Sequence, residues 1–245
     1  MMKHICITTF KMHHKDITYK VLLVGDMGTG KTSLLKRVIH NIFSPHYKTT
    51  IGVDFALKII EMDDGSKIKL QFWDIAGQER FSSSMTRVYY KDAVAAFVVF
   101  DITRETTTLD GARKWKQDID AKVMLPNSDT PIPTILLANK IDLFTPDDYD
   151  THWGKSSEDM DLFCQTNGFT GWFETTALDG SHKGMTNATA KLLQLIKSAV
   201  PEEPVSWTNT HPIVDINPEP VKNTTVVHKL KFSIITPSLK NLLDR

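Results

Sequence analysis

One stretch constrains this chain more than any other: residues 25–32 read Gly-Asp-Met-Gly-Thr-Gly-Lys-Thr. The stretch follows an apolar run at residues 21–24 and precedes apolar residues at helical spacing, which are Leu34, Leu35, Val38, Ile39 and Ile42. Small residues between a strand and a helix let backbone N–H groups surround a phosphate, and the helix N-terminus adds partial positive charge. We therefore predict a phosphate-binding loop. The alternative, a plain glycine-rich turn, would not require a strand directly before it and a helix directly after it.

The predicted contacts of this loop follow from the chemistry of a polyphosphate. The Lys31 ammonium neutralises negative charge, and the Thr32 hydroxyl offers an oxygen ligand to Mg²⁺. Backbone N–H groups supply the remaining contacts. The expected contacts in this segment are Gly28, Thr29, Gly30, Lys31, Thr32 and Ser33.

Composition indicates one folded domain with extensions. The chain has 245 residues, 41% of them apolar and 24% charged, enough for one core with about forty to sixty residues to spare. Basic and acidic residues balance at 29 each, which indicates neither a nucleic-acid partner nor an acidic membrane surface. Cys6 and Cys164 are the only cysteines, which suits a cytoplasmic protein. We expect no signal peptide or membrane span, because no apolar run is long enough.

Alternating apolar residues predict two paired strands after a proline-containing loop at residues 43–50. The first strand carries Val53, Phe55, Leu57 and Ile59, and a turn follows at residues 63–65. The second carries Ile68, Leu70, Phe72 and Ile75, with Trp73 as a large apolar residue on the opposite face. Continuous apolar runs at residues 93–100 and 132–138 predict buried central strands, and a short strand is expected around residues 172–173.

Helical spacing predicts helices between these strands. One carries Leu109, Ala112, Trp115 and Ile119; a second, capped by Ser157, carries Met160 and Phe163; the last, which Pro201 stops, carries Met185, Ala188, Leu192, Leu195 and Ala199. This succession predicts the α/β class, with a mostly parallel six-stranded sheet and helices on both faces. We expect a flexible extension at residues 1–17, one domain at residues 18–200 and a flexible proline-containing tail at residues 201–245, with a short docking helix at residues 239–243 as the alternative.

Two further motifs end predicted strands, where ligands of such sheets bind. Residues 74–77 put Asp74 within reach of the Mg²⁺ shell and let the Gly77 N–H meet a γ-phosphate. Residues 139–142 read Asn-Lys-Ile-Asp, so Asp142 can accept both N–H donors of a guanine edge while Asn139 ties loops together. Each motif alone is also typical of an ordinary turn, but with the phosphate-binding loop they predict a guanine nucleotide.

Residues 19–199 resemble the Ras-like small GTPases, and their sequence motifs resemble those of the Rab family. The resemblance rests on Thr-Ile-Gly-Val-Asp-Phe at residues 50–55, on Trp-Asp-Ile-Ala-Gly-Gln-Glu-Arg-Phe at residues 73–81 and on the tyrosine pair at residues 89–90. Other segments, at residues 55–58, 85–91, 97–101 and 168–175, are similar to the Rab branch associated with lysosome-related organelles. The resemblance implies a GTP/GDP switch in vesicle and organelle traffic, that is, a GTP hydrolase that is slow until an activating protein assists.

The resemblance also implies roles for individual residues. Gln78 orients the attacking water, and Thr50 joins Thr32 on Mg²⁺ while Asp74 acts through a water. The residues that flank, read or cover the guanine are Phe43, Asn139, Lys140, Asp142, Thr176 and Ala177, the last through its backbone N–H. The resemblance also implies a monomer that is peripheral on the cytosolic face of endomembranes. Its implied partners are an exchange factor, a GTPase-activating protein and effectors, and the effectors dock on both switches at Phe55, Trp73 and Tyr89.

The chain departs from the family pattern at several points. Residues 82–88 are one residue longer than the usual Rab spacing in the second switch, Leu178 stands where the family has Lys, and Met27 stands where Ras has glycine. Rabs end in prenylated cysteines, whereas no cysteine follows Cys164 here. These departures leave open a GTP-binding interaction module with little or no hydrolysis. A P-loop kinase is a third class, against which the Asn-Lys-x-Asp motif argues.

Overall fold

The structure is a computed structural model that describes residues 16–46, 48–63, 65–81, 83–144, 155–178, 180, 183–200 and 227–228. The predicted extensions at residues 1–17 and 201–245 lie outside the described residues, apart from 16–17 and 227–228. None of the helices in the described part is both long and apolar enough to cross a membrane.

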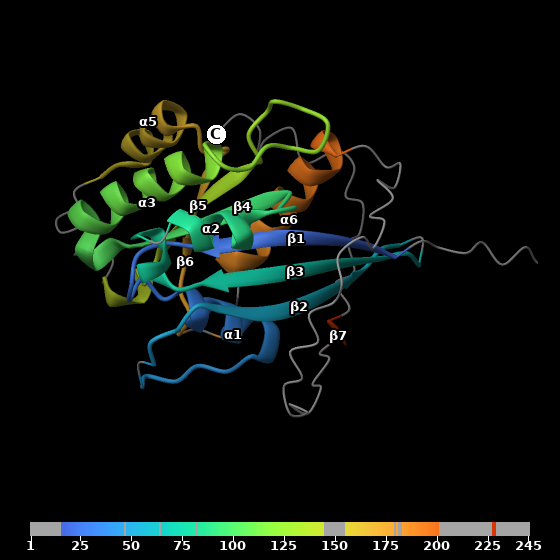
Figure 1. Cartoon of the computed structure of the whole chain (residues 1–245). Coiled ribbons are helices and arrows are strands. Elements are labelled where there is room, and N and C mark those ends of the chain that lie inside the picture. Colours follow the sequence, from blue (N-terminus) through green and yellow to red (C-terminus); the bar gives the residue numbers. More distant parts are fainter. Residues whose placement is uncertain are drawn as a thin grey trace, which may run out of the picture.

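A central sheet organises the fold (Figure 1). Its strands are β1 Ile17–Val24, β2 Val53–Glu61, β3 Lys67–Ile75, β4 Ala95–Asp101, β5 Thr134–Asn139, β6 Trp172–Thr175 and β7 Val227–His228. They lie in the order β6-β5-β4-β1-β3-β2-β7, and β2–β3 is the antiparallel pair. The predicted α/β class and mostly parallel sheet are confirmed. The two-residue strand β7, which pairs in parallel with Ile59 and Ile60 of β2, is an addition that the sequence did not predict.

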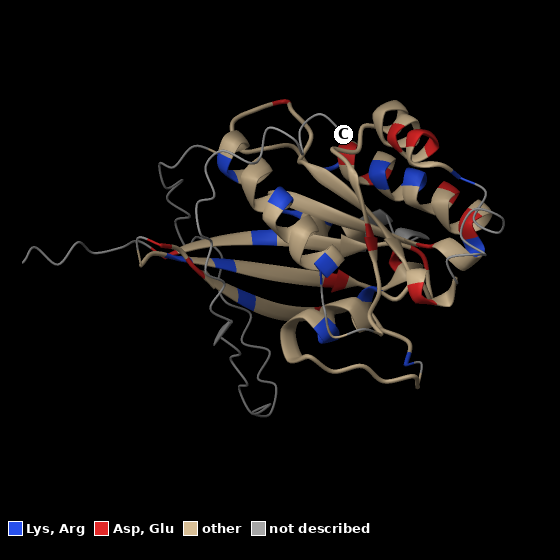
Figure 2. Cartoon of the chain, turned by 180° about the vertical axis from the view of Figure 1, so that it is seen from behind, with Lys and Arg blue, Asp and Glu red and all other residues tan. Residues whose placement is uncertain are grey.

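Helices cover both faces of the sheet, as predicted (Figures 1 and 2). On one face lie α1 Lys31–His40 and α6 Lys183–Ala199, and on the other lie α2 Ser83–Tyr90, α3 Glu105–Asp120 and α5 Ser157–Asn167. Three short 3-10 helices, η1 Gly77–Phe81, η2 Ile102–Arg104 and η3 Ile141–Leu143, follow β3, β4 and β5. Figure 2 shows basic and acidic residues interspersed over these elements, in keeping with their equal numbers.

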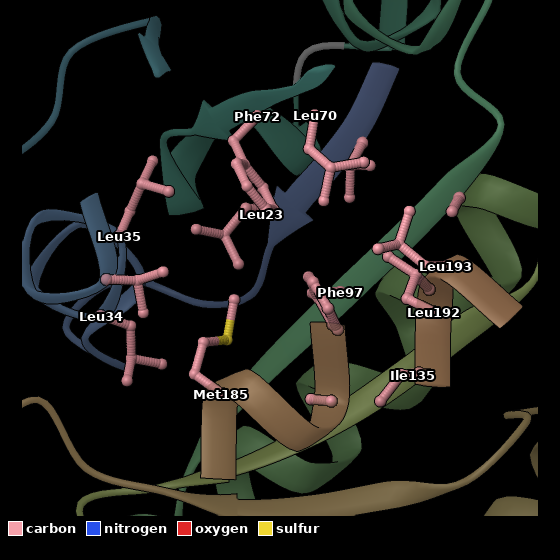
Figure 3. Packing of buried hydrophobic residues seen from close by; sticks show 14 of the residues in the cluster. Leu23, Leu34, Leu35, Leu70, Phe72, Phe97, Ile135, Met185, Leu192 and Leu193 are labelled. Atoms are coloured by element: carbon pink, nitrogen blue, oxygen red, sulfur yellow. The ribbon is translucent and has the colours of Figure 1, made fainter. Parts of the chain in front are cut away.

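Two apolar clusters form the core, one on each face of the sheet. Side chains alternate along a strand, so Leu23 and Phe97 pack with α1 and α6, whereas their neighbours Leu22 and Val98 pack with α3 and α5. Figure 3 shows the first cluster, in which Met185 reaches from α6 toward Leu23. All seven residues of β4 are buried, as a central strand covered on both faces requires.

This topology sets where a ligand can bind. Strand β1 lies between β3 and β4, and the strand order runs outward from it in both directions. The carboxyl end of β1 is therefore a topological switch point, where open α/β sheets form their ligand crevice. The predicted phosphate-binding loop begins there, directly after Val24.

Three local details go beyond or against the sequence analysis, which left the covered face of β2 open. The exposed fractions of Phe55 and Leu57 are 53% and 41%, while Lys58 and Ile60 are buried, because the face of β2 that carries Ile60 is the one packed into the α1–α6 cluster. Helix α1 ends at His40 with a left-handed Asn41 cap, so Ile42 lies beyond it and is exposed. Helix α2 was not predicted at all.

The third correction concerns the start of α5. Ser156, not Ser157, is its N-cap: the Ser156 hydroxyl accepts a hydrogen bond from the Asp159 N–H at 3.2 Å. The Asp159 carboxylate in turn accepts one from the Ser156 N–H at 3.0 Å. The two residues form a capping box, which satisfies two backbone donors that the helix itself leaves unpaired.

Replacing the cap should separate these two serines. Ser156→Ala removes the capping hydroxyl and should lower the free energy of unfolding by about 1 kcal/mol. Ser157→Ala changes an exposed residue already inside the helix and should leave it within about 0.5 kcal/mol. Urea unfolding monitored by circular dichroism measures both, and a larger loss for Ser157→Ala would contradict the assignment.

Candidate functional site

The phosphate-binding loop is held against the ends of two neighbouring strands. A Cβ atom on Gly25, whose φ is +144°, would collide with the Val99 carbonyl of β4, and one on Gly30, whose φ is +94°, would collide with the side-chain amide of Asn139 at the end of β5. Both backbone conformations are ones that glycine adopts readily. The glycines therefore allow the loop to lie directly on its neighbours, with the N-terminus of α1 behind it.

Lys31 is the buried cation of this loop. Only 5% of the residue is exposed, and its Nζ donates to the carbonyl oxygens of Gly25 at 2.8 Å and Asp26 at 3.0 Å. Burial lowers the pKa of Lys31 to about 8, with Asp74 and Asp26 acting in the opposite direction. The ammonium is thus still charged at neutral pH and oriented by the loop before a ligand arrives. A buried cation in this state favours an anionic partner.

Three oxygen-bearing side chains meet beside Lys31. The Thr32 hydroxyl lies 2.8 Å from the Thr50 hydroxyl and donates to Asp74 Oδ2 at 2.5 Å. Asp74 is fully buried, and its Oδ1 has no hydrogen-bond partner among the described residues. Burial raises the pKa of Asp74 to about 6, although the Thr32 hydrogen bond and Lys31 oppose the shift. Two hydroxyls and an unsatisfied buried carboxylate oxygen fit Mg²⁺, which prefers oxygen ligands.

Gly77 brings the second switch against the phosphate-binding loop. A Cβ atom at this position would lie 2.6 Å from the Asp26 carbonyl carbon and 2.8 Å from Met27 Cα, so the two backbones are in direct contact. The next residue, Gln78, is exposed and lines the same cavity as Lys31. Met27 is 56% exposed and shares this wall. Any group bound at the end of a phosphate chain would therefore meet Gly77, Gln78 and Met27 together.

Asn139, the first residue of the Asn-Lys-Ile-Asp motif, links this motif to the phosphate-binding loop. Its Nδ2 donates to the Thr29 carbonyl at 2.8 Å, and its Oδ1 accepts from the Thr175 hydroxyl at 3.2 Å. Asn139 is buried, and the same is true of Thr29 and Thr175. This agrees with the predicted role of Asn139 in tying the loops together.

Asp142 is oriented by the neighbouring loop after β6. The Thr176 hydroxyl donates a short hydrogen bond to Asp142 Oδ1 and accepts one from the Leu178 N–H at 2.9 Å. The carboxylate is therefore held at the mouth of the cavity, which Asp142 lines. Two carboxylate oxygens in this position can accept two parallel N–H donors, the pattern of a guanine edge.

Lys140, the second residue of the Asn-Lys-Ile-Asp motif, lies in the left-handed backbone region with φ 73°. Its Nζ donates to Asp101 Oδ2 at 2.6 Å, and Arg104 Nε donates to the same oxygen at 3.1 Å. Burial alone would raise the pKa of Asp101, but these bonds and one from Thr103 hold it below its usual value. Arg104 also donates to the Met27 carbonyl at 3.2 Å, so Asp101 connects the base side to the phosphate side.

One cavity of about 480 Å³ collects most of the predicted site residues. Its wall includes Gly28, Gly30, Lys31, Thr32, Ser33, Phe43, Thr50, Gly77, Gln78, Asn139, Lys140, Asp142 and Ala177. Three predicted residues, Thr29, Asp74 and Thr176, do not line it. They lie behind the wall and hold Asn139, Thr32 and Asp142 through the hydrogen bonds above.

Sequence reasoning missed three charged residues that support this wall. Asp101 carried a usable signal, because it ends a predicted central strand at the edge where ligands bind. No sequence pattern could have identified Arg37 in α1 or Arg104 in η2, because their partners lie 140 and 77 residues away in the sequence. The cavity wall also includes Lys36, Ile42 and Leu143, to which no role was assigned.

The three aromatic residues predicted to meet effectors form a separate surface. Phe55 and Trp73 are paired across β2 and β3, with ring centroids 4.6 Å apart in an edge-to-face arrangement. Lys20 Nζ lies 3.3 Å from the centroid of the Trp73 ring on its other side, and burial lowers the pKa of Lys20 to about 8. Tyr89 is half-buried and packs against the same core cluster as Trp73.

The comparisons with known proteins agree with this geometry. A family model described as Ras family matches residues 20–198. Ras-related protein Rab-32A of Dictyostelium discoideum is 57% identical over 164 residues, which are 67% of this chain and 72% of that protein. Ras-related protein Rab-32 of Homo sapiens is 55% identical over 67% of this chain and 69% of its own length. Ras-related protein Rab-7L1 of Mus musculus is 42% identical over 87% of this chain and 99% of its own length.

A phosphate-binding loop at a topological switch point, with oxygen ligands for a divalent cation and an Asn-Lys-x-Asp motif, defines the class of guanine-nucleotide-binding P-loop proteins. Within that class the chain belongs to the Ras family and is a Rab-like small GTPase, a GTP hydrolase of membrane trafficking. It binds GTP and GDP, and proteins of this kind work with exchange factors, activating proteins and effectors.

The Asn139 contacts should be measurable as nucleotide retention. Asn139→Ala leaves the Thr29 carbonyl without its donor and frees the two loops, so GDP should dissociate about tenfold faster or more, since a lost buried hydrogen bond costs about 1–3 kcal/mol. Asn167→Ala is the matched control, because Asn167 makes one local bond at the end of α5. Release of a fluorescent GDP measures both, and equal rates for the two variants would contradict the linking role.

Proposed function

We propose that this chain is a GTP-operated switch in which one cavity binds the nucleotide and reports the presence of the γ-phosphate. The observation that carries this proposal is the convergence of Lys31, the Thr32–Thr50–Asp74 cluster and Asp142 on that cavity. A cation and oxygen ligands suit a metal-bound phosphate chain, and a carboxylate suits the N–H donors of a base. None of these contacts favours the alternative, a GTP-binding interaction module with little hydrolysis, over the switch.

Phosphate binding rests on the phosphate-binding loop and α1. In this proposal Lys31 and the backbone N–H groups of residues 28–33 hold the β- and γ-phosphates at the N-terminus of α1. Thr32 and Thr50 would ligate Mg²⁺ directly, and Asp74 would act through a water. The bound Mg²⁺ neutralises charge that develops on the phosphate oxygens.

Guanine recognition rests on the two loops after β5 and β6. Asp142, held by Thr176, accepts the two N–H donors of the base, and the Ala177 N–H meets its exocyclic oxygen. Lys140 covers one face of the base and Phe43 flanks it. Adenine lacks the donor pair, so selection for guanine follows from hydrogen-bond complementarity.

Hydrolysis needs a positioned water more than covalent chemistry from the protein. Gln78 orients this water, and Thr50 and Gly77 contact the γ-phosphate. Losing the γ-phosphate removes these contacts and releases both switch segments, which shifts the population of the effector-binding state. The unassisted rate should be slow, about 10⁻⁴ to 10⁻³ per second.

The aromatic surface of Phe55, Trp73 and Tyr89 is the proposed effector site, since it lies on β2, β3 and α2 next to both switch segments. An exchange factor and a GTPase-activating protein act on the same switches. We propose a monomer that is peripheral on the cytosolic face of endomembranes, and the family resemblance favours those of lysosome-related organelles.

Nucleotide extraction tests this function directly. Purified protein, denatured and analysed by chromatography, should release guanine nucleotide in about equimolar amount, and the refolded or nucleotide-exchanged protein should release phosphate from GTP. An adenine nucleotide, or bound GTP that is not hydrolysed with or without candidate activating proteins, would contradict the proposal.

Thr32→Asn tests the metal ligand. An amide in place of this hydroxyl disturbs the cluster with Thr50 and Asp74, so GTP affinity should fall at least tenfold more than GDP affinity. Thr106→Asn, an exposed change in the first turn of α3, is the control and should alter neither affinity. Equal losses of GTP and GDP affinity would count against Thr32 as a Mg²⁺ ligand.

Gln78→Leu tests the position of the water. The side chain is exposed and takes part in none of the hydrogen bonds described above for the wall, so GTP affinity should stay within about threefold while single-turnover hydrolysis slows at least tenfold. Gln117→Leu, on the exposed face of α3, is the matched control. An unchanged hydrolysis rate in Gln78→Leu would mean that another group orients the water.

A further inference from the structure

Arg37 makes four hydrogen bonds around the base end of the cavity. From the last turn of α1, its Nε donates to the Ala177 carbonyl at 2.7 Å and one terminal nitrogen donates to the Leu178 carbonyl at 3.0 Å. The other terminal nitrogen donates to both oxygens of Asn41, each at 3.1 Å. One planar guanidinium therefore connects the end of α1 to the loop after β6. Hydrogen bonds from a charged donor are stronger than neutral ones.

The same side chain also lies close to a second residue that lines the cavity, Phe43. Its central carbon lies 5.9 Å from the centroid of the Phe43 ring, within the range of a cation–π contact. Phe43 and Ala177 both line the cavity. Arg37 is half-buried and lies outside the cavity wall, so it would act on a base through these two residues.

Arg37 holds the carbonyl of Ala177, and the N–H of the same residue, one peptide unit earlier, has no partner in the described part of the chain. The Ala177 N–H makes no hydrogen bond to a described residue, although only 7% of Ala177 is exposed. The Leu178 N–H is already used by the Thr176 hydroxyl. With the carbonyl oxygens of Ala177 and Leu178 held by one cation, the orientation of the peptide between them is defined from outside the cavity.

The sequence gives a reason why this chain needs such support. Where related small GTPases have a lysine at the end of this loop, this chain has Leu178, which is 52% exposed and carries no charge. Arg37 supplies a cation to the same loop from a different element, the helix that also begins at Lys31. The base loop and the phosphate loop are thus attached to opposite ends of α1.

We infer that Arg37 is a positioning residue for guanine recognition: it orients the loop at residues 176–178 so that the Ala177 N–H meets the exocyclic oxygen of the base. This inference rests on the proposed function, because it assumes that a guanine occupies the cavity. It assigns Arg37 to one edge of the base only. Asp142, which the Thr176 hydroxyl holds and Arg37 does not contact, reads the other edge.

Two modified nucleotides separate these edges. In 6-thio-GDP a sulfur, which is a poorer hydrogen-bond acceptor, replaces the exocyclic oxygen, while both N–H donors remain. In inosine diphosphate the oxygen remains and the 2-amino donor is absent. Dissociation constants for GDP and both analogues are measured by titration for the wild type, Arg37→Gln, Arg37→Lys and the control Arg113→Gln, which removes an arginine paired with Asp110 on the outer surface of α3.

The expected result is selective. Arg37→Gln should bind GDP about tenfold more weakly, as the loss of charge-assisted hydrogen bonds implies, and its preference for GDP over 6-thio-GDP should fall about threefold or more. Its preference for GDP over inosine diphosphate should equal that of the wild type. Arg37→Lys, which keeps one cation but not the fork, should give intermediate values, and Arg113→Gln should match the wild type.

Other outcomes would overturn the inference. If Arg37→Gln weakens all three nucleotides by the same factor, Arg37 only stabilises the fold. If Arg37→Lys behaves like the wild type toward 6-thio-GDP, the forked hydrogen bonds of Arg37 to the two carbonyls do not position the loop. A variant that fails to fold is replaced by Arg37→Lys for this comparison. A wild type that does not prefer GDP to inosine diphosphate would instead overturn the proposed guanine site itself.

Discussion

The buried ammonium of Lys31 is the interaction on which the rest of the site depends. A charge in this position is costly unless it is hydrogen-bonded and paired, and the chain meets the first need with the carbonyls of Gly25 and Asp26. An anion bound at the N-terminus of α1 would supply the opposite charge that pairs with this ammonium. Glycines at three loop positions, the close approach of Gly77 and the amide of Asn139 all serve to keep backbone near this cation.

The site works as a switch because side chains from different segments make hydrogen bonds to the same atom. Thr32 touches Thr50 from the first switch and Asp74 from the end of β3, so one hydroxyl joins α1 to both switch segments. Asp101 joins Lys140 and Arg104, and hence the base side to the phosphate side. A ligand that bridges these segments stabilises all of them together, which is how the loss of one phosphate group can release distant loops.

Prediction from the sequence succeeded where the requirement is local. The central strands and helices α3 and α6 follow from periodicity within a few residues. It left open which face of β2 is covered, because alternation defines two faces but not which one a helix will cover. It was wrong by one residue about the cap of α5, because two adjacent serines differ only in backbone conformation.

The sequence alone determined the class of this protein and the chemistry of its ligand, since a phosphate-binding loop that ends in Lys31 and Thr32, followed by an Asn-Lys-x-Asp motif, allows few other uses. Tertiary structure alone decided which residues support those groups. Arg37 meets Ala177 across 140 residues and Arg104 meets Met27 across 77, and no local pattern encodes such pairs. They arise because a parallel sheet gathers the ends of distant strands at one edge, where charged side chains from neighbouring loops come into hydrogen-bonding distance.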